Sequence, residues 1–168
     1  KEGKFVDFFL NNSKNSLDTA KLLFEASTNQ RLKHSLGFPE FNSFLWVVNS
    51  SYYSMFYITR ALFEKNGIKI KTELSVHEVT FNALVYYFYL TRKLEKSIIE
   101  SFQEASEEAK EILGKEKAKA LVEEYYSEKD KRGRFTYEMG EIAMRNKAQT
   151  SLERAKRFNE EIRKLLLL

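Results

Sequence analysis

The fold is decided by residues 50–68, Ser-Ser-Tyr-Tyr-Ser-Met-Phe-Tyr-Ile-Thr-Arg-Ala-Leu-Phe-Glu-Lys-Asn-Gly-Ile, in which small residues are interspersed with aromatic ones. Small side chains let two helix backbones approach closely, and the neighbouring rings fill the space beside them. Asn66 and Gly67 then supply the left-handed backbone that commonly ends a helix. The stretch therefore predicts a buried helix around which other helices pack.

On both sides of this stretch, apolar residues recur at intervals of three and four, as they do on one face of a helix. Strand-like alternation of useful length does not occur in the sequence. We therefore predict an all-α fold, an antiparallel bundle of about five to six helices. The predicted helices cover residues 5–26, 41–65, 75–90, 94–114 and 115 to about 128, with a last helix from near residue 146.

Two segments interrupt the helical period, and one helix start carries a capping pattern. Residues 27–39 collect Ser, Thr, Asn, Gln, Gly and the single proline, which predicts a loop. Residues 130–146 contain two glycines and mix basic with aromatic residues, which predicts an ordered but irregular segment. Ser75, with Glu78 three residues later, predicts a capping box at the start of the helix over 75–90.

Composition limits the class of protein. The chain has 168 residues, 43% hydrophobic and 31% charged, so we treat 1–168 as a single domain that buries roughly 70% of its unfolded surface. The absence of cysteine excludes disulfides, zinc–thiolate sites and thiol nucleophiles. We find no apolar run of membrane-spanning length and no export signal, and we expect a cytoplasmic protein without a membrane partner.

Residues 50–68 resemble the second-helix signature of the HEPN family, small all-α domains found in prokaryotes beside nucleotidyltransferases and in RNA-cleaving toxins. The likeness spans roughly residues 5–165. Gly67 matches the family's helix end, Ser-Val-His at 75–77 its Ser/Thr-x-His helix entry, and residues 132–137 its Arg-x-x-Ala-Asp-Tyr run. The resemblance implies a four-helix up-and-down core with an extra helix, and a homodimer.

The sequence departs from the family in its chemistry. Members that cleave RNA carry an arginine followed, after four to six residues, by a histidine. This chain has only His34 and His77, and neither follows an arginine at that spacing. Arg132 and Tyr137 occupy the corresponding positions, and a phenol with a pKa of about 10 is a poor proton shuttle near neutrality. We therefore expect no ribonuclease action by the family's usual route.

Positive charge around residues 129–147 marks a candidate anion site at the start of the last helix, where amide groups and the helix dipole also favour phosphate. Tyr137 can stack a base there, and His77 is noteworthy for its place at the entry of the third helix. The alternatives are a solvated basic turn, a Tyr137 that caps the core, and a His77 with a structural hydrogen bond. The candidate nucleotide- or RNA-binding residues are Arg132, Arg134, Tyr137, Arg145, Lys147 and His77.

Other residues are assigned to structure first. The helical spacing of the tyrosines favours core and interface positions over base stacking, although Tyr53 lies off the main stripe and can face a partner. Four glutamates predict a solvated helix face with lysine neighbours, and no metal motif is recognised among them or around the histidines. These glutamates are Glu104, Glu107, Glu108 and Glu111.

Three functions are compatible with these observations. The first is a HEPN-like domain that binds nucleotide, RNA or a partner nucleotidyltransferase in a toxin–antitoxin-like pair; the resemblance makes Tyr137 a candidate acceptor of nucleotide in such a pair. The second is a metal-independent endoribonuclease whose base is His77 or Tyr137. The third is a structural helical dimer without a ligand. We expect no cofactor and no metal, since phosphate loops, dinucleotide fingerprints and nucleophile elbows are missing from the sequence.

Overall fold

The computed structural model describes residues 3–70, 75–113 and 133–168, and the side chains of all of these except residues 113 and 133–140. This part of the chain is all-helical and contains no strand, which confirms the predicted fold class. The elements are α1 (Val6–Thr28), α2 (Gln30–Ser35), α3 (Phe44–Lys65), α4 (Val76–Leu84), the π-helical turn η1 (Val85–Tyr89), α5 (Lys96–Leu113) and α7 (Gly133–Leu167).

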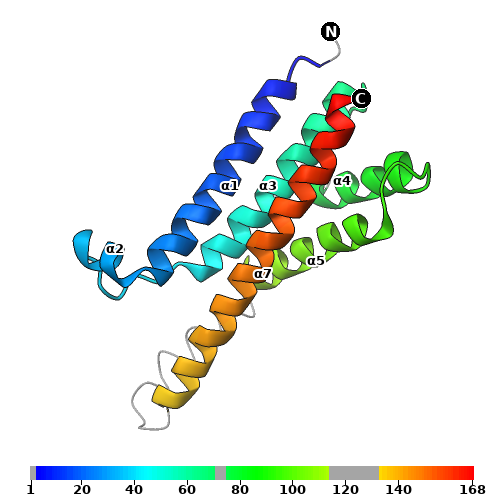
Figure 1. The fold of residues 1–168 in the computed structure, drawn as a ribbon. Coiled ribbons are helices and arrows are strands. Elements are labelled where there is room, and N and C mark those ends of the chain that lie inside the picture. Colours follow the sequence, from blue (N-terminus) through cyan, green and yellow to red (C-terminus); the bar gives the residue numbers. More distant parts are fainter. Residues whose placement is uncertain (1–2, 71–74, 114–132) are drawn as a thin grey trace.

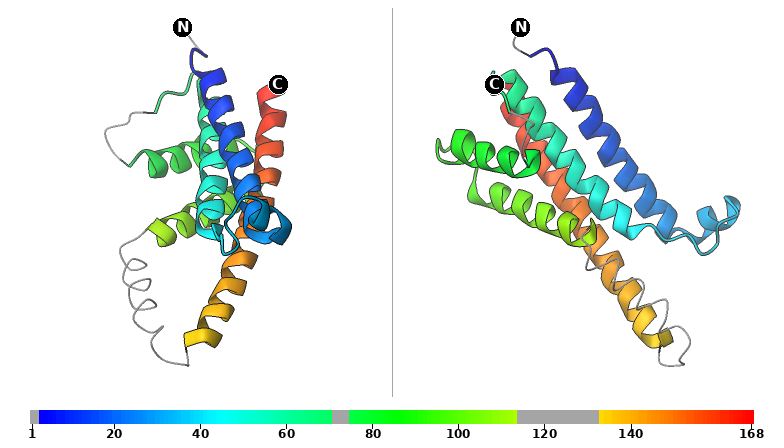
Figure 2. Two further views of the ribbon diagram at one scale, coloured as in Figure 1. Left: turned by 90° about the vertical axis from the view of Figure 1, so that its left-hand side faces the viewer. Right: turned by 180° about the vertical axis from the view of Figure 1, so that it is seen from behind.

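The central element is α3, which contacts α1, α4, α5 and α7. Figure 1 shows α1 descending beside α3, and α7 rising beside α3 in the same direction as α3. The antiparallel pair formed by α4 with η1 and by α5 crosses this layer, as both views of Figure 2 show. The helices α1, α3 and α7 thus form one layer, in which α1 runs antiparallel to α3 and α7.

The end of α3 has the predicted form. Gly67 has a φ of 68°, in the left-handed region that glycine adopts without a steric penalty. The amide of Ile68 donates to the carbonyl oxygen of Phe63 at 2.9 Å, and the amide of Gly67 donates to that of Glu64 at 3.3 Å. These two bonds are the Schellman arrangement, which satisfies carbonyl groups that the helix end leaves unpaired.

The start and end of the α4–η1 unit differ from the prediction in detail. Ser75 is the N-cap residue of α4, but its side chain makes no capping hydrogen bond, so the predicted capping box with Glu78 is not formed. The helix continues through residue 84 into η1, where the amide of Leu90 donates to the carbonyl oxygen of Val85, five residues earlier. Arg92 follows with a φ of 59°, and this left-handed residue makes the turn into α5.

Three segments need correction or lie outside the described residues. The predicted loop over 27–39 contains the short helix α2, whose first turn is capped by Asn29: its side-chain oxygen accepts from the amide of Leu32 at 3.1 Å. The predicted irregular segment over 130–146 is wrong from residue 133 onward, because α7 begins at Gly133 rather than near Asn146. The predicted helix over 115–128 lies outside the described residues.

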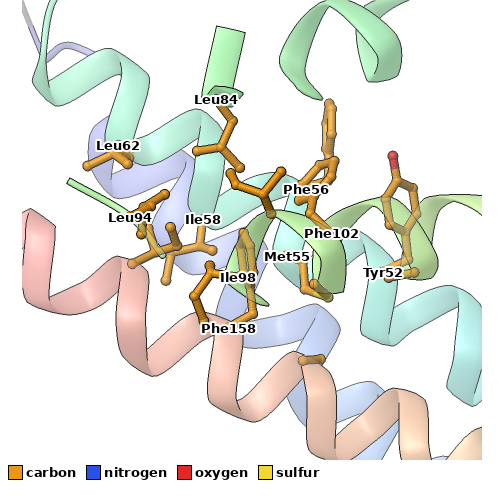
Figure 3. Packing of buried hydrophobic residues seen from close by; sticks show 14 of the residues in the cluster. Tyr52, Met55, Phe56, Ile58, Leu62, Leu84, Leu94, Ile98, Phe102 and Phe158 are labelled. Carbon is orange, nitrogen blue, oxygen red and sulfur yellow. The ribbon is translucent and has the colours of Figure 1, made fainter. Parts of the chain in front are cut away.

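The hydrophobic core lies between α3, α4, α5 and α7 (Figure 3). Its fully buried members include Phe63 and Met55 of α3, Phe102 of α5 and Phe158 of α7. A smaller cluster of Ala20, Phe44, Val47, Val48, Ala148 and Leu152 joins α1, α3 and α7 near the other end of α3. Within the part of the chain described here, no helix is both long and apolar enough to cross a membrane.

A buried polar network also joins three helices. The Ser13 hydroxyl of α1 lies 2.8 Å from the backbone oxygen of Ser54 on α3 and 2.8 Å from Oδ1 of Asn159 on α7. The Nδ2 group of Asn159 donates to the Ser54 hydroxyl at 3.1 Å. All three residues are at least nine-tenths buried, so their hydrogen bonds fix the register of α1 and α7 on α3.

Candidate functional site

A pocket of about 250 Å³ opens between α3, the first turn of α4 and the second half of α5. It combines aromatic rings with an amide, a hydroxyl, an imidazole and an ammonium group. Its lining residues are Asn49, Tyr52, Tyr53, His77, Ser106, Ala109 and Lys110.

Helical spacing brings these side chains together. Residues 49, 52 and 53 of α3 are separated by three and four positions, and so are residues 106, 109 and 110 of α5, so each set lies on one face of its helix. His77 is the second residue of α4 and reaches the same place from the helix start. In Figure 3, Tyr52 lies at the edge of the apolar cluster, with its phenol oxygen directed away from Met55.

A hydrogen bond links Tyr52 of α3 to His77 of α4. The phenol oxygen of Tyr52 lies 2.8 Å from Nδ1 of His77. Burial raises the pKa of Tyr52, and a hydrogen bond from Ser106 partly offsets this rise. Nδ1 of His77 is occupied by the Tyr52 phenol, and Nε2 is the ring nitrogen left for a ligand. His77 therefore offers the pocket one ring nitrogen that can hydrogen-bond to a ligand.

The environment of His77 favours the neutral ring. Its centroid lies 4.5 Å from that of Phe56 and 5.8 Å from that of Tyr53, which is oriented edge-on. Burial lowers the pKa of His77, and the positive charge of Lys110 lowers it further. The imidazole therefore stays uncharged at neutral pH.

This shift predicts a pH-dependent stability. Because the pKa of His77 is lower in the folded protein than the 6.5 of an ordinary histidine, the unfolded chain takes up this proton first as the pH falls. The free energy of unfolding should therefore fall as the pH is lowered from 6.5 toward the folded-state pKa. Urea unfolding at about pH 7.5 and about pH 5 measures the change.

The matched comparison for this prediction uses the other histidine. His77→Gln should reduce the loss of stability between the two pH values, whereas His34→Gln, at an exposed position on α2, should leave the contribution of His77 in place. An equal pH dependence in wild type and His77→Gln would show that the folded-state pKa of His77 is not lowered.

Asn49 is the most unusual group of the pocket. The residue is only 9% exposed, and its buried Oδ1 atom has no hydrogen-bond partner among the residues that the structure describes. A buried acceptor without a donor costs about 1–3 kcal/mol. Unpaired groups of this kind are rare in folded proteins and call for an explanation. A ligand that donates a hydrogen bond in this pocket would remove the penalty.

The structure describes the side chains of only some of the predicted site residues. His77 lies in the pocket. Lys147, on α7, lies 2.9 Å from Oε2 of Glu111, so an ion pair already neutralises part of its charge. Arg145 is exposed on α7. Arg134 and Tyr137 lie in the first two turns of α7 as backbone, without described side chains, and Arg132 lies outside the described residues.

Sequence reasoning missed Asn49, Ser106 and Lys110 as site residues. Tyr53 had a signal, its place off the main stripe of α3, whereas Ser106 and Lys110 lie within the acidic run of α5. That run was predicted to face solvent with lysines of its own helix. Glu104, Glu107 and Glu111 are exposed as predicted, whereas Glu108 is half-buried. Arg154 of α7 also pairs with this face, at 2.8 Å from Oε2 of Glu108 and at 3.0 Å from Oε2 of Glu104.

Other candidate sites offer fewer groups that are free to bind a ligand. A larger hollow of about 550 Å³ lies at the turn before α5 and is lined partly by Arg92, Lys93 and Lys96. Two of these cations already have partners: Lys96 pairs with Glu100 at 2.8 Å, and Lys93 lies over the ring of Phe88. In the described ranges, no group of three or more His, Asp or Glu side chains is arranged to hold a metal ion.

Comparisons with protein-family models, with curated proteins and with solved structures gave no match. The likeness to HEPN domains therefore rests on the residues quoted above, and what it implies about activity and partners stays a prediction. The fold and the pocket are established from the chain itself, and a functional proposal must be argued from their chemistry.

Proposed function

We propose that this protein is a non-catalytic binding domain for nucleotides or single-stranded RNA, and that the base enters the pocket between α3, α4 and α5. The observation that carries the proposal is the buried Oδ1 atom of Asn49, unpartnered among the described residues, in a pocket that the rings of Tyr53 and His77 also line. A nucleobase is a flat ring with hydrogen-bonding groups on its edge, and it complements both features.

The size and charge of the pocket indicate which part of a nucleotide lies inside it and which part lies at its mouth. About 250 Å³ is below the usual range for sites that enclose a whole drug-sized ligand, so the base fits inside and the sugar and phosphate stay at the mouth. Lys110 lines the pocket and is solvent-exposed, which suits contact with a phosphate. Tyr53, half-buried, presents a ring for stacking.

The pocket favours binding over cleavage. A general base needs an unprotonated nitrogen within reach of the substrate. Nδ1 of His77 already lies 2.8 Å from the Tyr52 phenol oxygen and is not free to take a proton from a ligand. Among the described residues that line the pocket, none is an arginine that could stabilise the transition state. RNA incubated with the protein should therefore stay intact, and cleavage that His77→Ala abolishes would establish the endoribonuclease alternative instead.

Binding predicts a loss of affinity on changing the pocket mouth. Fluorescence anisotropy with a short labelled RNA at low salt should show binding by the wild type. Tyr53→Leu removes the stacking ring and should cost about 1–3 kcal/mol. Lys110→Ala removes one phosphate contact and should reduce the salt dependence by about 0.7 in the slope of log K against log salt concentration.

Two matched variants serve as controls. Tyr86→Leu and Lys156→Ala change an exposed tyrosine of η1 and an exposed lysine of α7, outside the pocket, and should bind RNA as the wild type does. No binding by the wild type, or equal affinity in all four variants, would refute the assignment of the pocket.

A protein partner is a second candidate, favoured by exposed rings at the start of α1. Phe5 and Phe8 are 47% and 57% exposed and lie edge to face with centroids 6.5 Å apart. Aromatic side chains of this kind are enriched in protein interfaces. A second copy of the chain and a nucleotidyltransferase are the partners that the HEPN resemblance suggests, and both are proposals from that resemblance.

A further inference from the structure

Aromatic side chains continue from the pocket along α3 and onto α1. Tyr53 lies 6.0 Å from Tyr57, and Tyr57 stacks on Phe9 of α1 at 6.4 Å, measured between ring centroids. The guanidinium carbon of Arg60 lies 5.1 Å from the centroid of Phe9. We call Tyr53, Tyr57, Phe9 and Arg60 the ring row; each of these side chains is half-buried rather than enclosed in the core.

The backbone explains why the row is continuous. Residues 53, 57 and 60 are spaced by four and three, so they occupy one face of α3. At 1.5 Å per residue, this face rises about 10 Å from Tyr53 to Arg60. Phe9 of α1 covers part of the same face, because α1 packs beside α3 (Figure 2).

Arg60 provides the second observation. It is half-buried against the rings of Phe9 and Phe56, yet among the described residues no carboxylate lies within the 4.0 Å of an ion pair. Burial lowers the pKa of its guanidinium, and the more distant charge of Glu64 raises it. An arginine stays charged under these conditions, so a half-buried cation without an ion pair lies at one end of the row and Lys110 at the other.

We propose that the ring row binds the continuation of a single RNA strand whose first base occupies the pocket. The inference rests on the proposed function of the pocket. The next bases stack on Tyr57 and Phe9, and a phosphate of the strand pairs with Arg60. Stacking rings combined with cations that contact the backbone are the arrangement by which proteins hold single strands without reading their sequence.

The row selects single strands over duplexes. In a duplex the faces of the bases are covered by their neighbours, and a base must leave the stack before it can lie on a side-chain ring. Free mononucleotides reach the pocket but leave Tyr57, Phe9 and Arg60 uncovered. Affinity should therefore rise with the length of a single strand and stay low for a duplex of the same sequence.

The test compares uridine monophosphate with uridine oligomers of two to six nucleotides. Dissociation constants are measured by calorimetry for the monophosphate and by anisotropy for the oligomers, both at low salt. The wild type should bind the longest oligomer at least tenfold more tightly than the monophosphate. Tyr57→Leu should weaken oligomer binding about tenfold, as expected for one lost stack, and leave monophosphate binding unchanged.

Conservative variants separate binding from folding. Tyr57→Phe keeps the ring and should bind as the wild type does, and Arg60→Gln should reduce the salt slope by about 0.7. Arg157→Gln, on the exposed face of α7, is the matched control for the lost charge. Thermal unfolding of each variant shows whether it is folded, and Arg60→Gln tests the row even where Tyr57→Leu does not fold.

The outcomes are distinguishable. Equal affinity for monophosphate and oligomer would overturn the ring row and leave the pocket standing, whereas no binding of either would overturn both. If light scattering shows a dimer that Tyr57→Leu or Arg60→Gln dissociates, the row is an interface between two copies of the chain, and the RNA proposal for it is wrong.

Discussion

Replacing Phe102 by alanine is expected to lower the free energy of unfolding by about 4 kcal/mol. Phe102 is fully buried on α5, and its ring centroid lies 5.6 Å from that of Phe158 on α7 and 5.8 Å from that of Tyr52 on α3. Removing the ring loses its apolar burial and leaves a cavity where three helices meet. Urea unfolding followed by far-ultraviolet circular dichroism measures the change through its midpoint.

The matched control is Phe38→Ala, in the connection between α2 and α3, where the ring is 63% exposed. Its effect should stay within about 0.5 kcal/mol. Phe102→Leu fills most of the space and should cost less than Phe102→Ala. A similar small loss for Phe102→Ala and Phe38→Ala would show that α5 does not pack on α3 and α7 through this ring.

The second large effect is expected at Asn159, which is 3% exposed and joins the Ser13 and Ser54 network. Asn159→Ala should lower the free energy of unfolding by about 3 kcal/mol, because it leaves two buried hydroxyl groups with fewer partners. Asn82→Ala removes an exposed amide from α4 and is the control. The measurement is again urea unfolding.

A double variant tests the mechanism at Asn159. Ser13→Ala together with Asn159→Ala removes both members of the hydrogen-bonded pair, so its cost should be smaller than the sum of the two single costs. Additive losses would mean that the two side chains do not interact, and that α1 and α7 are placed on α3 by apolar packing alone.

The central helix was the most predictable part of the fold. Small and aromatic residues on several faces require neighbours all round, and Met55, Ile58, Leu62 and Phe63 are indeed fully buried. The end of this helix was equally clear, because glycine tolerates the positive φ found at Gly67. Local chemistry and burial agree here, which is the condition under which sequence patterns are reliable.

The start of α7 was mispredicted for a physical reason. Figure 1 shows its first turns projecting beyond the end of α3, away from the other labelled helices. The apolar residues Phe135, Met139 and Ile142 do recur there at helical intervals, but the basic run before them and the mixture of basic and aromatic residues suggested an irregular segment instead. Gly140 added to the error, but a single glycine costs only about 1 kcal/mol relative to alanine in a helix of 35 residues.

The pocket could be predicted only in part. His77 was noticed because it stands at a helix entry, and its tyrosine partner lies 25 positions away in the sequence. Asn49 and Lys110 come from two different helices, and their nearness depends on how α5 packs on α3. Sequence spacing within one helix carries no information on how two helices pack. The basic residues around Arg132 and Arg134 were proposed as a site because they lie close together along the chain, which is the kind of cluster that a sequence does show.

The most direct test of the binding account is a crystal structure of the protein with a short uridine oligomer. We predict density for one base in the pocket, against the rings of Tyr53 and His77 and within hydrogen-bonding distance of Asn49, with its phosphate beside Lys110. An empty pocket, with the oligomer held instead at Arg132 and Arg134 or not at all, would contradict the account.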